Sequence, residues 1–151
     1  RGFPLVVFRP CKLYGPGDRS FEYGPGSFLY SVLMGEPVRL YGDGSELRDH
    51  LFIEDLVQIV RHFAQNDESG IYNLASGVSR TYQDLLSIMR TVTKKAFEII
   101  HEDRTRLQID QTVDVSLLKQ AVTGLRLTSL EQGVRETFLD MEQRLPEETR
   151  H

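Results

Sequence analysis

The stretch of sequence that decides the fold is Leu5-Val6-Val7-Phe8-Arg9-Pro10-Cys11-Lys12-Leu13-Tyr14-Gly15-Pro16-Gly17-Asp18. Its first four residues are consecutive apolar side chains with two valines, which predicts a strand buried on both faces. Turn formers are then frequent through position 26, which predicts a long loop, and long loops are often functional. Such a strand seldom starts a domain, and the first residue is not methionine, so we expect a chain cut from something longer.

The composition is that of an ordinary globular protein. With 151 residues, of which 40% are hydrophobic and 26% charged, the chain is long enough for one domain with its own core. A formal net charge of −4 argues against a broad nucleic-acid surface, which requires an excess of basic residues. No apolar run reaches membrane-spanning length and the first residues do not have the pattern of a signal peptide, so we expect a cytoplasmic protein without membrane or nucleic-acid partners.

The cysteine and histidine content predicts neither a disulfide nor a metal site. Cys11 is the only cysteine, which excludes an intrachain disulfide. The four histidines are scattered and show no metal-ligand spacing: His50, His62, His101 and His151.

The order of the predicted elements is that of an α/β protein. After the opening strand, apolar runs predict strands over 38–41, 51–53, 71–75 and 97–101. Helical spacing predicts helices over 28–34, 53–63, behind Thr81, around 117–118 and over 130–145. Two or three of the strands have the pattern of burial on both faces, and the others that of a small separate sheet.

Two helices have recognisable start signals. In the second helix, Glu54 and Asp55 occupy the first turn, and the predicted inward face is Ile53, Leu56, Val57, Val60 and Phe63. The spacing of Thr81 and Asp84 resembles a capping box, although the usual partner is Glu or Gln.

The last two helices also carry cap signals. Thr128 with Glu131 predicts a full capping box at the start of the last helix. Its inward face is predicted as Leu130, Val134, Phe138, Met141 and Leu145. Asp114 is a candidate cap for the short helix before it.

The motifs of catalysis and dinucleotide binding are absent from the sequence. No strand leads through a glycine-rich turn into a helix, and there is no P-loop or nucleophile elbow. None of the six tyrosines has a lysine four residues later, so Tyr-x-x-x-Lys is missing. We therefore predict no catalytic residue in this chain.

Five segments together resemble the extended short-chain dehydrogenase/reductase family, in its order and spacing. The nearest members are nucleotide-sugar epimerases, 4,6-dehydratases and related decarboxylases. The segments are Arg9–Asp18, Gly35-Glu36-Pro37 with Leu40–Ser45 and Arg48-Asp49, Leu51–Leu56, Ile71–Gly77, and Asp114-Val115-Ser116 with Thr128–Gly133.

The resemblance implies a fold and a cofactor. Residues 1–151 would be the substrate-binding carboxyl-terminal region of an NAD(P)-binding Rossmann-fold enzyme: the last sheet strands plus a small substrate-binding α/β domain. Strands near 4–9 and 71–75 would complete the sheet of a missing amino-terminal domain. NAD, or NADP as the alternative, would be bound mostly by that missing half, with Arg9, Pro10 and Cys11 bordering the nicotinamide. The intact protein could be a homodimer.

The resemblance also implies two arginines that bind a diphosphate. Arg48 occupies the position of a diphosphate-binding arginine; its alternative is a surface ion pair with Glu46 or Glu54. Arg104 occupies the position of a second phosphate arginine, with Arg106 as its rival, and a solvated loop is the alternative for both.

The remaining candidate residues would contact other parts of the substrate. Tyr41 and Arg39 flank the position where the family meets the nucleotide base, and packing is the alternative for Tyr41. Lys12 replaces the usual Asn, so it would bind phosphate or an acidic sugar, or point to solvent. Leu107 stands where some epimerases have Asp, which argues against strict identity as a UDP-galactose epimerase. Cys11 is expected to line the core or pocket rather than act as a nucleophile.

The predicted function is the substrate-binding portion of an NAD-dependent nucleotide-sugar epimerase/dehydratase such as UDP-glucose 4-epimerase. It would hold a nucleoside diphosphate sugar against the nicotinamide and be inactive alone. The alternatives are a stand-alone non-catalytic nucleotide-sugar binding module and a non-sugar reductase of the same family.

Overall fold

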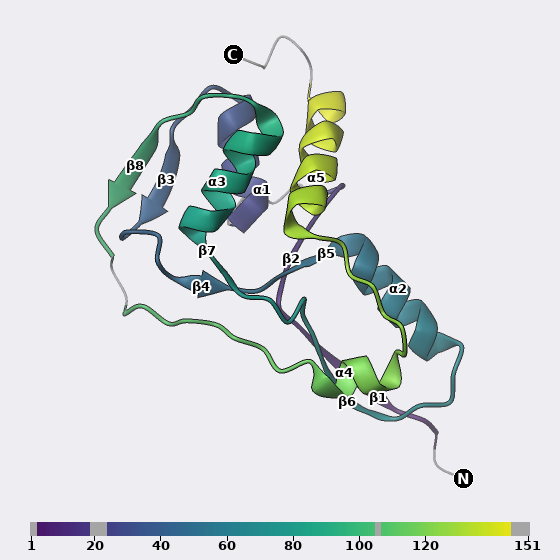
Figure 1. The fold of residues 1–151 in the computed structure, drawn as a ribbon. Helices are drawn as coiled ribbons and strands as arrows, with labels where there is room; N and C mark the ends of the chain where they lie inside the picture. The colour runs from purple at the N-terminus through teal and green to yellow at the C-terminus, as the bar shows by residue number, and fades with distance from the viewer. Residues whose placement is uncertain (1–2, 19–23, 105–106, 146–151) are drawn as a thin grey trace.

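The computed structural model describes residues 3–18, 24–104 and 107–145 (Figure 1). The chain is α/β, as predicted from the order of its apolar patterns. In chain order the elements are β1 (Val6–Pro10), β2 (Lys12–Tyr14), α1 (Gly24–Leu33), β3 (Val38–Tyr41), β4 (Leu47–Arg48), β5 (His50–Phe52), α2 (Ile53–Ala64), β6 (Gly70–Leu74), β7 (Arg80–Thr81), α3 (Tyr82–Thr93), β8 (Ile99–Glu102), α4 (Ser116–Ala121) and α5 (Leu130–Arg144).

The described strands pair two by two. β1 with β6, β2 with β5, and β3 with β8 are parallel, whereas β4 and β7 form a two-residue antiparallel pair. The predicted small separate sheet corresponds to β3 and β8, which lie apart from β1 and β6 in Figure 1. The strands β2, β4 and β7 are not predicted from the sequence, because each has only two or three residues and lies next to turn-forming residues.

Two hydrophobic clusters divide the chain. In the first cluster, α1, α3 and α5 pack together beside β3; Leu29, Leu33, Leu85, Met89 and Met141 are among its fully buried members. In the second, α2 and α4 pack on the β1–β6 pair through Leu51, Ile59, Leu74 and Leu118. Figure 1 shows these two groups of elements joined by β2, β5 and the segment before α5.

The prediction that the first strand is buried on both faces is wrong for this structure. Val7 is 42% exposed and its register partner Ile71 is 53% exposed. Val6 and Phe8 point to the opposite face and pack against the second cluster, because successive side chains of a strand alternate. No described element covers the face that carries Val7.

The inward face of α2 differs from the predicted one. Val57 and Val60 are 51% and 40% exposed, whereas Ile59 is fully buried. Helical spacing alone predicts Val57 and Val60 on the inward face together with Phe63, since all three fall within one wide apolar stripe. The packing partners select the side of that stripe that carries Ile59 and Phe63.

The predicted caps have different outcomes. Thr81 and Asp84 form the predicted capping box, each side chain accepting the other's backbone N–H at 3.0 Å. The N-cap residue of α4 is Val115 and not the predicted Asp114, although the carboxylate of Asp114 accepts the amide of Ser116, the first residue of α4, at 2.9 Å. The prediction of a capping box formed by Thr128 and Glu131 is wrong. Ser129 caps α5 instead, because both the amide and the hydroxyl of Thr128 donate to the buried Asp55, at 2.8 and 2.9 Å.

Candidate functional site

A cavity of about 350 Å³ lies between α1, β3 and the start of α3. Ser27, Phe28 and Ser31 line it from α1, while Arg39 and Tyr41 line it from β3. Glu46 and Tyr82 also line it. These elements border the same opening because α1 packs on β3 in the first hydrophobic cluster and Tyr82 packs against that cluster.

Two of the predicted site residues, Arg48 and Arg104, meet at the carboxylate of Glu46, which lines this cavity, although neither arginine lines it. Arg48 Nη2 pairs with Oε1 of Glu46, and Arg104 Nη1 lies 3.6 Å from Oε2 of the same side chain. The Arg48 and Arg104 side chains are only 16% and 21% exposed, so neither is a freely solvated surface group. The alternative ion pair of Arg48 with Glu46 is therefore present, but it is shared with the second arginine.

Further contacts fix both guanidinium groups. Arg48 Nη1 donates to the carbonyl oxygens of Leu47, at 2.8 Å, and of Ile109. Arg104 Nη2 lies 3.5 Å from a carboxylate oxygen of Asp43. Arg104 also passes over Gly42, where an added Cβ would lie 2.0 Å from Arg104 Nε. Glycine is required at position 42 for two reasons. Its φ is +77°, and a side chain there would collide with Arg104.

Arg39 and Tyr41 lie at the rim of the cavity. Strand alternation buries Val38 and Leu40 and turns Arg39 and Tyr41 outward. Arg39 forms an ion pair of 2.5 Å with Glu102 on β8, and Tyr41 is 57% exposed. Both side chains are available to a ligand, and their role in base recognition stays a prediction.

Lys12 is part of the same electrostatic environment. It pairs with His50 in the β2–β5 register. Burial and then the nearby Arg48 lower the pKa of Lys12, while Glu46 raises it. Lys12 therefore lies near enough to Arg48 and Glu46 to feel their charges, although it does not line the cavity.

The residues predicted to border a nicotinamide lie at the end of β1. Arg9 and Pro10 are exposed, and Cys11 is half-buried with its Sγ 3.7 Å from a carboxylate oxygen of Asp49. Burial, and then the Asp49 carboxylate, raise the pKa of the Cys11 thiol to about 12. A thiol with this pKa is protonated at neutral pH, which fits a lining residue and not a nucleophile. Arg106, the rival of Arg104, lies outside the described residues.

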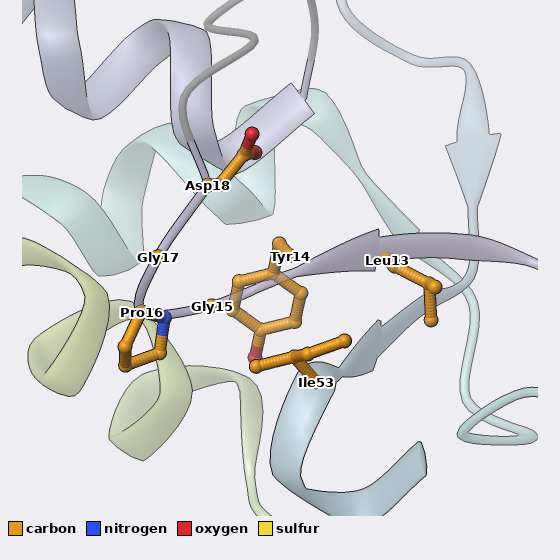
Figure 2. A pocket seen from close by; sticks show the side chains of 7 residues that line it. All are labelled: Leu13, Tyr14, Gly15, Pro16, Gly17, Asp18 and Ile53. Atoms are coloured by element: carbon orange, nitrogen blue, oxygen red, sulfur yellow. The ribbon is translucent and has the colours of Figure 1, made fainter. Parts of the chain in front are cut away.

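A second cavity, of about 380 Å³, lies along the loop after β2 (Figure 2). Figure 2 shows Leu13, Tyr14 and Ile53 on one side of this loop and Asp18 at its far end. Gly17 N donates to Asp140 of α5 at 3.0 Å, which holds the loop against that helix. Among the residues that the structure describes, the lining is mostly apolar or backbone, and Asp18 is its only charged side chain.

The described residues meet neither the requirements of a metal site nor those of a membrane-spanning helix. Within residues 3–18, 24–104 and 107–145, no three His, Cys, Asp or Glu side chains come together as a metal site. None of the helices formed by these residues is both long and apolar enough to cross a membrane.

Sequence reasoning missed the central position of Glu46. It considered Glu46 only as an ion-pair partner that would make Arg48 a surface residue. The available signal was the two-residue spacing of Glu46 and Arg48, which places neighbouring side chains of an extended segment on one side. The meeting with Arg104 joins residues 58 positions apart and has no local signal.

The class of protein follows from comparison with known families. Residues 1–75 match the NAD dependent epimerase/dehydratase family, and the whole α/β arrangement matches solved structures of that fold. The chain belongs to the NAD dependent epimerase/dehydratase family.

Several of the relatives that the chain matches are enzymes named for nucleotide sugars. The chain is 24% identical to UDP-N-acetyl-alpha-D-glucosaminuronate decarboxylase of Bacillus cytotoxicus, over 91% of this chain and 46% of the relative. It is 28% identical to ADP-L-glycero-D-manno-heptose-6-epimerase of Nitratidesulfovibrio vulgaris, over 89% and 50%. The structure of UDP-glucose 4-epimerase of Thermotoga maritima with UDP-glucose superposes with a TM-score of 0.82 and 25% identity, over 93% and 47%. The chain thus spans about half the length of the relatives it matches.

Proposed function

We propose that this chain is the substrate-binding portion of an NAD-dependent nucleotide-sugar epimerase or dehydratase similar to UDP-glucose 4-epimerase. The observation that supports it best is the convergence of Arg48 and Arg104 on one carboxylate beside a cavity. Guanidinium groups offer forked donors that match phosphate oxygens, so two of them within reach of one anion suit a diphosphate.

The arrangement of the cavity suggests how the substrate lies. The nucleotide base would occupy the space between α1 and β3, next to Tyr41 and Arg39. The diphosphate would meet Arg48 and Arg104, and Lys12 would face the phosphates or the sugar. A volume of about 350 Å³ is in the range of small-molecule sites. Binding the distant nucleotide tightly is how such a chain would orient the sugar for reaction.

The cofactor does not fit a site built by this chain alone. The sequence contains no Gly-x-Gly-x-x-Gly turn of the kind that cradles a dinucleotide, and Tyr-x-x-x-Lys is also absent from it. We therefore propose that NAD, with NADP as the alternative, is held mostly by residues outside this chain. Its β1–β6 pair would complete the dinucleotide-binding sheet, with Arg9, Pro10 and Cys11 bordering the nicotinamide. The redox chemistry belongs to the cofactor, and this chain contributes binding and orientation.

The 151-residue chain alone is expected to show no turnover, because it has neither the catalytic tyrosine and lysine nor a dinucleotide cradle. The measurement is incubation with NAD and UDP-glucose or UDP-galactose, followed by chromatography of the sugar nucleotides. Formation of epimer, keto sugar or pentose product above the protein-free blank would contradict this expectation.

Arg48→Ala is expected to weaken binding of a nucleoside diphosphate by roughly 1.5–3 kcal/mol, the range for a hydrogen bond to a charged group. Calorimetry with UDP, dTDP, GDP, CDP and ADP would identify the nucleotide that the unmodified chain binds and then measure the variant. Arg61→Ala, which removes an exposed arginine of α2, is the matched control and should leave the affinity unchanged. Binding of none of these nucleotides by the unmodified chain would overturn the proposed function.

A second candidate is a stand-alone, non-catalytic module that binds nucleotide sugars. The observation in its favour is the missing catalytic pair. The reading frame upstream of Arg1 distinguishes the two candidates: a Gly-x-x-Gly-x-x-Gly segment followed by Tyr-x-x-x-Lys favours the enzyme, and a start codon close to Arg1 favours the module.

A further inference from the structure

We propose that Glu46 is an internal counter-anion of the diphosphate site, which neutralises Arg48 and Arg104 in the free protein and lowers the affinity for the incoming diphosphate. This inference rests on the proposed function of the same site. It assigns a role in tuning affinity to a carboxylate that does not itself bind the phosphate.

The geometry of Glu46 is that of a substitute anion. One carboxylate oxygen pairs with Arg48 Nη2 and the other lies 3.6 Å from Arg104 Nη1. Its side chain is 16% exposed and lines the cavity. Each oxygen thus faces a different guanidinium group, which is the arrangement expected of two phosphate oxygens held by the same pair.

Both arginines have contacts other than the one with Glu46. Two backbone carbonyl oxygens hold Arg48, those of Leu47 and Ile109. Arg104 lies over Gly42 and within 3.5 Å of Asp43. Because of these contacts, we expect both guanidinium groups to keep their positions when the charge on Glu46 is removed. The carboxylate therefore acts mainly through its charge.

This charge opposes the ligand. A nucleoside diphosphate brings about two negative charges to the two arginines, and like charges a few ångströms apart repel. The Glu46 carboxylate must either leave the arginines or remain beside the phosphates, and both cost free energy.

The test is Glu46→Gln, which keeps the size of the side chain and removes its charge. In calorimetric titrations, UDP and inorganic pyrophosphate are expected to bind about five- to tenfold more tightly to the variant, since one like charge near 4 Å contributes about that much even in high dielectric. Uridine, which has no phosphate, is expected to bind equally to both proteins. Glu46→Ala is a second variant and should shift the affinity for UDP in the same direction.

Glu131→Gln is the matched control, since it makes the same change of net charge at an exposed residue of α5 that does not line the cavity. Among the described residues, Glu131 forms no ion pair with an arginine, so we expect less than about a twofold change. Equal or weaker binding of UDP by both Glu46 variants would overturn the inference, as would an equal gain in the Glu131 control. Failure of all the proteins, the unmodified chain included, to bind UDP or pyrophosphate would instead overturn the proposed function and the inference with it.

Discussion

Asp49→Ala is expected to destabilise the chain by about 3–5 kcal/mol, because it leaves two backbone amides without their charged acceptor. Asp49 is fully buried between β4 and β5. Its two carboxylate oxygens accept the amides of Ser76 and Gly77, each at 2.8 Å. These amides belong to the turn that follows β6, so the carboxylate ties the arginine-bearing strand to the β1–β6 pair. The change would also displace Arg48, its neighbour in sequence.

Urea unfolding followed by circular dichroism measures this effect. Asp49→Asn retains one carbonyl acceptor but presents its amino group to the other N–H, so we expect an intermediate loss. Asp114→Ala is the matched control: this exposed carboxylate accepts a single amide, from Ser116 at 2.9 Å, and its loss should cost no more than about 1 kcal/mol. An Asp49→Ala variant within 1 kcal/mol of the unmodified chain would show that water replaces the carboxylate.

The helices could be predicted from sequence because their signals are local. The capping box at Thr81 and the inward residues Leu85, Leu86 and Met89 of α3 appear as predicted. The predicted start of α1, at Phe28, is too late, because Pro25 and the two glycines beside it are typical of a loop. Proline is tolerated in the first turn of a helix, and α1 begins at Gly24.

The errors at Thr128 and in α2 share one physical reason. The local sequence indicates which contacts a residue is able to make. Which of these contacts forms in the fold depends on residues that are distant in sequence. Asp55 takes both donors of Thr128 across a separation of 73 positions, so the next residue becomes the cap. In α2 the packing partners favour Ile59 over Val57, although both fit helical periodicity.

The candidate site could be predicted only in part, because its residues come from separate segments. Motif order suggested Arg48 and Arg104, and the structure brings both to Glu46. Their role toward a phosphate stays a prediction. Hydrophobic patterns contain no information about the shared carboxylate, nor about burial of the polar residues Asp49 and His50.

The imidazole ring of His50 is buried without hydrogen-bond partners for its nitrogens among the described residues. It belongs to β5 and is 7% exposed, and neither ring nitrogen has a hydrogen-bond partner among the described residues. The rings of Tyr14 and Tyr82 lie beside it, with centroids 6.2 and 6.4 Å away. Burial, and then the charge of Lys12, lower the pKa of His50 from 6.5 to about 4; Arg48 adds to this, and Asp49 opposes it.

This lowered pKa makes stability depend on pH. Between pH 6.5 and 4 the unfolded chain binds a proton at His50 that the folded chain does not, so the free energy of unfolding falls as the pH falls through this window. The loss amounts to about 3 kcal/mol by pH 4, and above pH 6.5 it is absent. His50→Phe keeps an aromatic ring and removes the ionisable group, so we expect it to abolish this contribution.

The measurement is the difference in free energy of unfolding between the His50→Phe variant and the unmodified chain, from urea titrations at several pH values. At pH 7.5 the two should be similar, or the variant slightly more stable, because replacing an unsatisfied polar group with an apolar one of similar shape is close to neutral. At pH 4 the variant should be more stable by about 3 kcal/mol. Lys12→Met removes one of the cations that lower the pKa of His50, so it should recover a smaller part of the loss. A difference that does not change with pH would mean that His50 is protonated as easily in the folded chain as in the unfolded one, and that its ring nitrogens reach water or a polar partner.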